Sequence, residues 1–319
     1  MTSVLITAAI PKAALQILQE AGIKVESYTG DTLITKAELL KRIVGKDYLI
    51  TPLSTQVDQE VIDADPQLKL IANFGAGFNN IDVQYARSKN IPVTNTPKVS
   101  TISTAEVTTG LIISLAHRIV EGDKVMRTTG FNGWAPLFFL GHELAGKTLG
   151  IFGMGQIGQA VAKRMAAFDM KIIYNQRHQL DVSVESSLHA KFVSFDELIK
   201  ESDVLTLHAP LTPETKHIIG VEQFQQMKAS AYLINASRGP VIDEQAFLQA
   251  LESKELAGAA LDVYEAEPHV EDGFKQLDNV ILTPHIGNAT VEARNAMAEI
   301  VAQNTVLSDQ GQEPKYIVN

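Results

Sequence analysis

Three ionisable side chains of complementary chemistry follow three different apolar segments in the last third of the chain: Arg238, Glu267 and His285. A histidine suits proton donation to a carbonyl oxygen, because its pKa can be placed near the working pH. A neighbouring carboxylate would orient the ring and favour its protonated form, and an arginine can bind and polarise a keto acid through charge-assisted hydrogen bonds. Each residue alone has an ordinary structural explanation, but together they predict the reduction of a 2-keto acid.

A glycine-rich turn precedes these residues in the chain. Gly153, Gly155 and Gly158 form a G-x-G-x-x-G pattern between an apolar segment (148–153) and an amphipathic segment (156–168). The first glycine permits a tight turn, the second lets a pyrophosphate approach the backbone, and the third allows close packing of helix on strand. The free N–H groups of the helix N-terminus would favour the phosphates. The pattern predicts a bound dinucleotide, although a glycine-rich loop that binds nothing is the alternative.

The position where a carboxylate would hold the adenosine ribose reads Asn175, Gln176 and Arg177, followed by His178. An acid there would accept hydrogen bonds from the ribose hydroxyls and repel a 2′-phosphate, whereas the guanidinium fork of Arg177 suits a phosphate. The sequence therefore predicts that NADP(H) is preferred and that NAD(H) is possible. The alternative is that Arg177 is a solvated cation beside an NAD(H) site.

Short apolar runs alternate with helix-like segments along the whole chain, which is typical of an α/β fold with parallel sheets. The runs that we expect to form strands are residues 3–7, 24–28, 47–51, 68–73, 91–95, 148–153, 171–175, 203–208, 231–235, 257–264 and 279–283. Five of them precede the glycine-rich turn. We therefore predict two Rossmann-like domains, with the dinucleotide-binding domain (100–287) inserted into a discontinuous substrate domain (1–99 and 288–319).

Several of these segments resemble the D-isomer-specific 2-hydroxy acid dehydrogenases, and the resemblance covers nearly the whole chain. The matching stretches are NFGAGFNNID (73–82), TLGIFGMGQIGQAVAKR (148–164), SDVLTLHAPLTPET (202–215), NASRG, LDVYEAEP and TPHIGNAT. The resemblance implies that Arg238 binds and polarises the substrate, that His285 is the acid/base, and that Glu267 pairs with His285.

The same resemblance implies contacts for the rest of the site. Gly75, Ala76, Gly77 and Arg238 would bind the substrate. The residues implied to bind the cofactor are Gly153, Gly155, Gln156, Ile157, Gly158, Gln176, Arg177, His208, Pro210, Thr215, Ala236 and Asp262, the last near the nicotinamide. Apart from the resemblance, a loop of small residues such as Gly75-Ala76-Gly77 exposes backbone N–H groups that can bind an anion; an ordinary turn is the alternative.

Within the family, residues 131–150 look most like the glyoxylate and hydroxypyruvate reductase branch. Asn79 and Asn288 stand where this branch leads us to expect Asp and Ser. A dehydrogenase for another acid, such as phosphoglycerate, formate or a bulky 2-keto acid, is one alternative. A dinucleotide-binding sensor or corepressor of the same fold is another. The set of Arg238, Glu267 and His285 argues against the sensor, because a sensor needs no proton relay.

An aromatic and apolar run includes Trp134, Phe138, Phe139 and Leu140. It could pack in the core of a domain, or it could form an arm that is buried against a second subunit, because exposed apolar patches usually mark interfaces. Members of the family that the chain resembles are typically dimers. We therefore predict a homodimer.

The composition narrows the classes of partner. The 319 residues carry a net charge of −10, which argues against nucleic acid and against anionic membrane faces. There is no cysteine, so disulfides, a thiol nucleophile and thiolate metal ligands are excluded, and we predict no metal site. No apolar run has the length of a membrane span, and the first residues do not resemble a secretion signal. We expect a cytoplasmic protein that acts on a small molecule.

Overall fold

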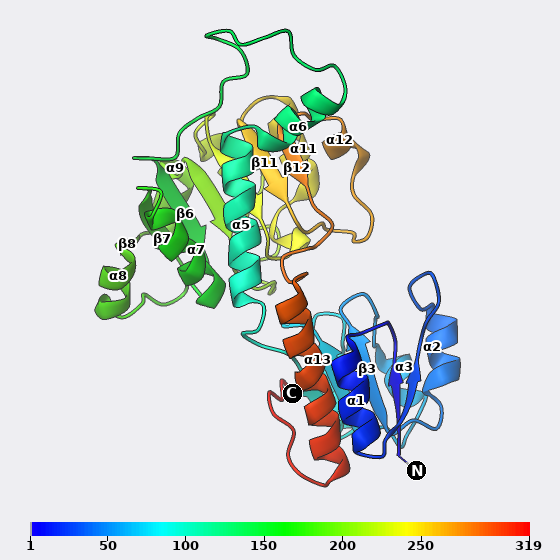
Figure 1. The fold of residues 1–319 in the computed structure, drawn as a ribbon. Coiled ribbons are helices and arrows are strands. Elements are labelled where there is room, and N and C mark those ends of the chain that lie inside the picture. Colours follow the sequence, from blue (N-terminus) through cyan, green and yellow to red (C-terminus); the bar gives the residue numbers. More distant parts are fainter. Residues whose placement is uncertain (1) are drawn as a thin grey trace. The chain divides into compact units, whose positions relative to one another are not determined.

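The computed structural model describes residues 2–319 and divides the chain into two compact units (Figure 1). Unit 1 consists of the residues up to Ser100 together with Ala289–Asn319, and unit 2 is Thr101–Asn288. Within residues 2–319, no helix has both the length and the apolar character that crossing a membrane requires.

Unit 1 is built on a five-stranded parallel sheet in the order β2-β1-β3-β4-β5. Its strands are β1 (Ser3–Ile6), β2 (Lys24–Ser27), β3 (Tyr48–Pro52), β4 (Leu70–Phe74) and β5 (Val93–Thr94). Its helices are α1 (Lys12–Glu20), α2 (Lys36–Ile43), α3 (Gln59–Asp63), α4 (Val83–Ser88) and α13 (Val291–Asp309).

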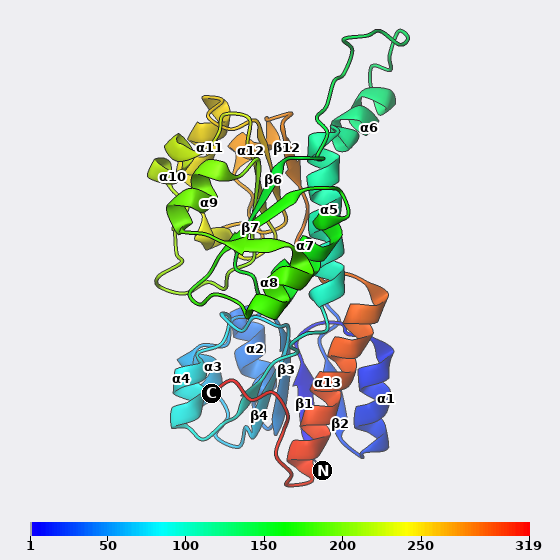
Figure 2. The same cartoon turned by 90° about the vertical axis from the view of Figure 1, so that its left-hand side faces the viewer.

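The alternation of side chains along β1 shows why this sheet is covered on both faces. Val4 and Ile6 pack in a cluster with α1 and α13, whereas Leu5, between them, packs in a cluster with α2, α3 and α4. The side chains of successive residues in a strand point to opposite faces of the sheet. A strand that is apolar at every position must therefore be covered on both faces. Figure 2 shows α1 and α13 side by side on one face of the sheet.

Unit 2 is built on a seven-stranded parallel sheet in the order β12-β11-β10-β9-β6-β7-β8. Its strands are β6 (Thr148–Phe152), β7 (Lys171–Asn175), β8 (Ala190–Phe192), β9 (Val204–Leu207), β10 (Tyr232–Asn235), β11 (Gly258–Leu261) and β12 (Val280–Leu282). Its helices are α5 (Thr101–Ala116), α6 (Ile119–Arg127), α7 (Gln156–Ala166), α8 (Val182–Leu188), α9 (Phe195–Glu201), α10 (Val221–Gln226), α11 (Glu244–Glu252) and α12 (Asp272–Lys275), with a 3-10 turn at Gly239–Val241.

Two separate clusters cover the faces of this second sheet. Helices α5, α7 and α8 pack on one face, and α9, α10, α11 and α12 pack on the other. The strand order reverses between β6 and β9, which lie next to each other although β7 and β8 separate them in the chain. In open α/β sheets the crevice at such a reversal is where ligands bind. The predicted α/β class with two Rossmann-like parallel sheets is confirmed.

Three strands differ clearly from the sequence-based expectation. One is β11, which ends at Leu261 and does not extend to residue 264 as predicted. β8 was not predicted, because Ala190–Phe192 is a short edge strand whose residues are not fully buried. Another is β5, which is shorter than the predicted 91–95; beyond it, the N–H of Asn95 bonds to the carbonyl of Tyr316 in the C-terminal tail.

Candidate active site

The carboxyl ends of three neighbouring strands of unit 2 carry the predicted catalytic residues. β10, β11 and β12 are parallel and adjacent, so the segments that follow them leave from one edge of the sheet. Arg238 follows β10, Glu267 follows β11 and His285 follows β12. The fold therefore brings together three residues that are far apart in sequence.

His285 and Glu267 form a hydrogen-bonded pair. The imidazole Nδ1 lies 2.9 Å from Oε2 of Glu267, and the backbone N–H of Tyr264 donates to Oε1 of the same carboxylate at 3.0 Å. His285 itself has a left-handed backbone with φ of 54°. Because Nδ1 faces the carboxylate, it carries the proton that the bond requires, and Nε2 is the ring atom left for a substrate.

Neighbouring charges and burial shift the pKa of Glu267 in opposite directions. Burial of the carboxylate raises its pKa, but the hydrogen bond from His285, the charge of His285, the N–H of Tyr264 and the charge of Arg238 together hold the pKa of Glu267 below its usual value. Glu267 is therefore ionised at neutral pH. An ionised carboxylate is the species that would stabilise a protonated imidazole.

Asp262 supports the loop that carries His285. Its carboxylate is 1% exposed and accepts from the Thr283 hydroxyl at 2.6 Å and from the N–H groups of Ile286 and Gly287, both at 2.8 Å. These bonds fix the backbone on both sides of His285. The additional contact of Asp262 with a cofactor, which the sequence suggested, stays a prediction.

Arg238 lies on a turn that Asn235 organises. The buried amide of Asn235 donates to the carbonyl of Arg238 at 3.0 Å, and its oxygen accepts from the N–H and hydroxyl of Ser237. The guanidinium bonds the Ser237 carbonyl at 2.6 Å, and within residues 2–319 it has no ion-pair partner. Burial lowers the pKa of Arg238 and the charge of Glu267 opposes this, but an arginine remains a cation at neutral pH. Its remaining donors can bind an anion.

Gly239 joins this turn to the segment that carries Glu267. A Cβ at Gly239 would lie 1.9 Å from the carbonyl carbon of Tyr264, so only glycine allows the two backbones to touch. The Tyr264 hydroxyl in turn donates to the carbonyls of Leu261 and Thr283, at 3.2 and 2.8 Å. The positions of the predicted catalytic groups are thus coupled through backbone contacts.

A second histidine–carboxylate pair borders the site, and the sequence did not single out its histidine. The His217 Nε2 lies 2.8 Å from Oε1 of Glu265, and the N–H of His217 donates to the carbonyl of Pro240 at 2.8 Å. These bonds tie the loop after β9 to the loops after β10 and β11. No sequence signal points to the pair, because its members are separated by two strands.

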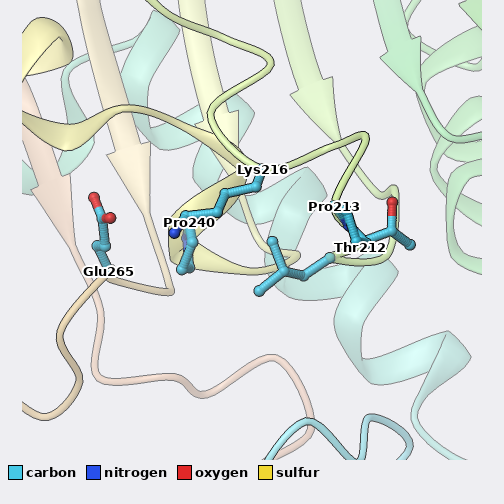
Figure 3. A pocket seen from close by; sticks show the side chains of 6 residues that line it. Thr212, Pro213, Lys216, Pro240 and Glu265 are labelled. Atoms are coloured by element: carbon cyan, nitrogen blue, oxygen red, sulfur yellow. The ribbon is translucent and has the colours of Figure 1, made fainter.

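A cavity of about 580 Å³ lies beside this second pair (Figure 3). It is lined by Leu211, Thr212, Pro213, Lys216, Pro240 and Glu265. In Figure 3, Lys216 and Pro240 lie between Glu265 on one side and Thr212 and Pro213 on the other. All six residues belong to the segments that follow the carboxyl ends of β9, β10 and β11.

The geometry of the glycine-rich turn fits a dinucleotide. A Cβ at Gly153, where φ is 96°, would lie 2.6 Å from the backbone N of Ala209, and a Cβ at Gly158 would collide with the carbonyl of Gly153. At Gly155 a Cβ would meet nothing within 4 Å, so the space above the N-terminus of α7 is open. Open space before free N–H groups of a helix suits a pyrophosphate.

His208 carries a buried polar atom that also fits a ligand. Burial lowers the pKa of His208 to about 4, so its ring is neutral at pH 7. Its Nε2 lies 3.0 Å from the Thr206 hydroxyl, whereas Nδ1 has no partner within residues 2–319. A buried polar atom without a partner is costly, and a bound cofactor could satisfy it.

Other predicted cofactor residues are placed around this edge. Gln176 donates to the carbonyl of His178 at 2.7 Å, and Arg177 is exposed. A hydrogen bond from Thr212 and, to a smaller extent, the charge of Arg177 lower the pKa of Glu214. The Thr215 hydroxyl bonds within its own loop, to the carbonyl of Pro210 at 2.7 Å. These contacts leave the predicted cofactor roles as predictions.

The predicted substrate loop Gly75-Ala76-Gly77 belongs to unit 1 and follows β4. A Cβ at Gly75 would lie 2.9 Å from the Leu53 side chain, which explains the need for glycine there. Within residues 2–319, no His, Asp and Glu side chains group in a way that could hold a metal ion.

The family described as "D-isomer specific 2-hydroxyacid dehydrogenase, NAD binding domain" matches residues 109–287, more than half of the chain. The chain belongs to this family. It is therefore an oxidoreductase with NAD-dependent 2-hydroxyacid dehydrogenase activity, and both the recognised family and the predicted enzyme class are confirmed.

Individual members of the family are similar to this chain over its full length. A Staphylococcus haemolyticus protein named as a 2-hydroxyacid dehydrogenase is 54% identical over all of both chains. The structure of a Thermus thermophilus protein is 40% identical, with a TM-score of 0.94 over all of both chains. An NADPH-dependent glyoxylate/hydroxypyruvate reductase of Sinorhizobium meliloti, solved with NADP and malonate, is 28% identical, with a TM-score of 0.85 over 99% of this chain and 96% of that one.

Proposed function

We propose that this 2-hydroxyacid dehydrogenase reduces a small 2-keto acid, glyoxylate or hydroxypyruvate, to the D-2-hydroxy acid. The observation that carries the proposal is the hydrogen-bonded pair of His285 and Glu267, with the unpaired guanidinium of Arg238 on the neighbouring strand end. The relative from Sinorhizobium meliloti, named as a glyoxylate/hydroxypyruvate reductase, supports the choice of substrate.

The three side chains have separate tasks in this reaction. Arg238 binds the substrate carboxylate and polarises the keto group through charge-assisted hydrogen bonds. The protonated Nε2 of His285 gives its proton to the carbonyl oxygen, and Glu267 stabilises the imidazolium before the transfer. The reduced nicotinamide, when bound, supplies the hydride to the carbonyl carbon. One hydride and one proton convert the keto acid to the hydroxy acid, and His285 is left neutral.

We propose that the cofactor is NADP(H) in preference to NAD(H), held by Gly153, Gly155 and Gly158 at its pyrophosphate. The support is the exposed Arg177 after β7, where a carboxylate would otherwise repel a 2′-phosphate, and the NADP bound in the relative from Sinorhizobium meliloti. His208 is proposed to use its unpaired Nδ1 toward the cofactor.

An absorbance assay at about 340 nm tests the proposal directly, since reduced nicotinamides are oxidised as the keto acid is consumed. NADPH and NADH are tested in parallel against glyoxylate, hydroxypyruvate, pyruvate and larger 2-keto acids. We expect turnover with glyoxylate and hydroxypyruvate. In Arg238→Ala, kcat/KM for these substrates should fall about 100-fold. An Arg164→Ala variant is the matched control, since this partly exposed arginine of α7 pairs with Glu106.

Two outcomes would remove the proposal. A better substrate with a bulky side chain would replace glyoxylate and hydroxypyruvate within the same reaction. Dinucleotide binding without turnover of any 2-keto acid would favour a sensor or corepressor of the same fold.

We also propose that the chain forms a homodimer and acts in the cytoplasm.

A further inference from the structure

We propose that Asn73 and Asn95 are positioning residues that turn the backbone of the Gly75-Ala76-Gly77 loop so that its N–H groups face the substrate carboxylate. The inference rests on the proposed function in its choice of ligand, an organic carboxylate. It assigns a task to two residues that no sequence pattern singles out. The whole arrangement lies within unit 1.

All three carbonyl groups of the loop are held by side-chain amides. The Asn73 Nδ2 donates to the carbonyl of Gly77 at 2.6 Å and to that of Gly75 at 3.2 Å. The Asn95 Nδ2 donates to the carbonyl of Ala76 at 2.6 Å. A carbonyl oxygen can only accept, so these contacts also fix which end of each amide faces the loop.

The N–H groups of the same three residues are left free. Within residues 2–319, those of Gly75, Ala76 and Gly77 donate no hydrogen bond, while the N–H of Thr96 adds a second donor to the Gly75 carbonyl at 3.0 Å. Ala76 is exposed, so ligands can reach the loop. With its carbonyls engaged and its donors free, the loop is arranged to bind an anion.

The two amides are themselves fixed by the surrounding fold. Asn73 is fully buried in β4, and its oxygen accepts from the Nδ2 of Asn80 at 3.3 Å. Asn95 is 9% exposed, and its N–H is bonded to Tyr316 in the C-terminal tail at 3.2 Å. A loop that is already in its binding conformation loses less freedom when the carboxylate arrives. Asn73 and Asn95 therefore act on substrate affinity.

The test compares Asn95→Ala, Asn73→Asp and a control, Asn304→Asp. Asn304 is also a buried amide of unit 1 and donates to a backbone carbonyl, that of Lys315 at 2.9 Å, away from the loop. We expect KM for the 2-keto acid to rise about tenfold in Asn95→Ala, equivalent to about 1.4 kcal/mol, with kcat and KM for NADPH nearly unchanged. Asn73→Asp should act in the same direction, because a carboxylate repels the carbonyls that the amide held.

Binding of oxalate, a carboxylate that is not reduced, provides a readout that does not depend on turnover. In the isotope-labelled full chain, oxalate should shift the amide NMR signals of Gly75, Ala76 and Gly77, and Asn95→Ala should raise the Kd about tenfold. If oxalate shifts these amide signals in a wild type that turns over no 2-keto acid, the proposed function is contradicted and this inference is still supported.

Three results would overturn the inference itself. Oxalate could leave the three amide signals of the wild type unchanged. Both Asn95→Ala and Asn73→Asp could bind oxalate as tightly as the wild type. Asn304→Asp could weaken binding as much as Asn95→Ala, which would mean that the effect comes from general loosening of unit 1.

Discussion

At the scale of single residues, the ionisation state of a carboxylate in the site depends on the charged groups beside it. Glu267 remains ionised although it is partly buried, because His285, Tyr264 and Arg238 together outweigh the cost of burial. Glu265, two positions earlier, bonds to a different histidine, His217. Both carboxylates bond to a histidine, but only Glu267 is proposed to take part in the proton transfer, so the two form a natural pair for comparison.

Replacing Glu267 by Gln should lower kcat about 100-fold, because the imidazolium of His285 loses its neighbouring charge. Glu265→Gln is the matched control and should retain most of the activity. Steady-state kinetics on the best 2-keto acid measures both. Equal losses in the two variants would contradict the assignment of Glu267 to the proton transfer.

The same substitution should change how stability depends on pH. The pKa of Glu267 is lowered by folding, so its contribution to stability is present above the unfolded-state pKa of about 4.3 and is lost as the pH falls through the folded value. Glu267→Gln has no such loss. The difference in Tm between wild type and Glu267→Gln should therefore shrink as the pH is lowered below about 4. A difference that is constant with pH would show that Glu267 makes no such contribution.

The proposed cofactor preference also rests on one residue. Arg177→Asp replaces a cation by the carboxylate that suits ribose hydroxyls and repels a 2′-phosphate. The ratio of kcat/KM for NADPH to that for NADH should fall about 100-fold, mostly through KM for NADPH. Arg87→Asp, an exposed charge reversal in unit 1, should leave the ratio unchanged. A wild type that already favours NADH clearly would refute the role given to Arg177.

At the scale of elements, the site is assembled from turns that follow adjacent parallel strands. β10, β11 and β12 bring the turns of Arg238, Glu267 and His285 to one edge, and backbone contacts then join those turns. Asn235 and Asp262 hold two of the turns through buried side chains. A change in one of these turns can therefore displace several of the proposed catalytic groups together.

Gly239→Ala should destabilise the chain by more than about 3 kcal/mol, because the new methyl group would overlap the backbone of Tyr264, which cannot move without shifting Glu267. Gly110→Ala in α5 is the control, since a Cβ there meets nothing within 4 Å. Alanine should stabilise that helix by about 0.5–1 kcal/mol. Thermal unfolding measures both, and a Gly239→Ala variant with wild-type Tm and activity would contradict the role of the contact.

At the scale of the whole molecule, one apolar segment, residues 131–140, lies outside the hydrophobic cores of both units. Residues 128–147 form no helix or strand, and Figure 1 shows the segment after α6 extending as a long loop. Trp134 and Leu137 are 84% and 85% exposed, so packing in a domain core, one of the two interpretations of the sequence, does not occur. Exposed apolar side chains of this size favour burial against a partner.

Light scattering at micromolar concentration should therefore give twice the mass of 34.7 kDa. The double variant Trp134→Ser with Leu137→Ser should shift the population toward the monomer, because the partner would bury less apolar surface. Val182→Ser with Val221→Ser, an apolar pair elsewhere in unit 2 that is 73% and 53% exposed, is the control. A wild type that scatters as a monomer would remove the proposed homodimer.

The sequence by itself determined the class of fold, the family and the type of chemistry. These depend on local patterns: continuous apolar runs for buried parallel strands, glycines at fixed spacing for the dinucleotide turn, and charged residues just after strand ends. Each pattern is readable because its members lie close together in the chain.

The tertiary structure decided the contacts between distant segments. The edge strand β8 has no apolar run of its own, and its pairing with β7 comes from the fold. His217 meets Glu265, Gly239 touches Tyr264, and Asn95 bonds to Ala76 only because separate strand ends are brought to one edge of a sheet. An amide or a glycine has no distinctive pattern in the sequence, since its role depends on the partner that the fold places beside it.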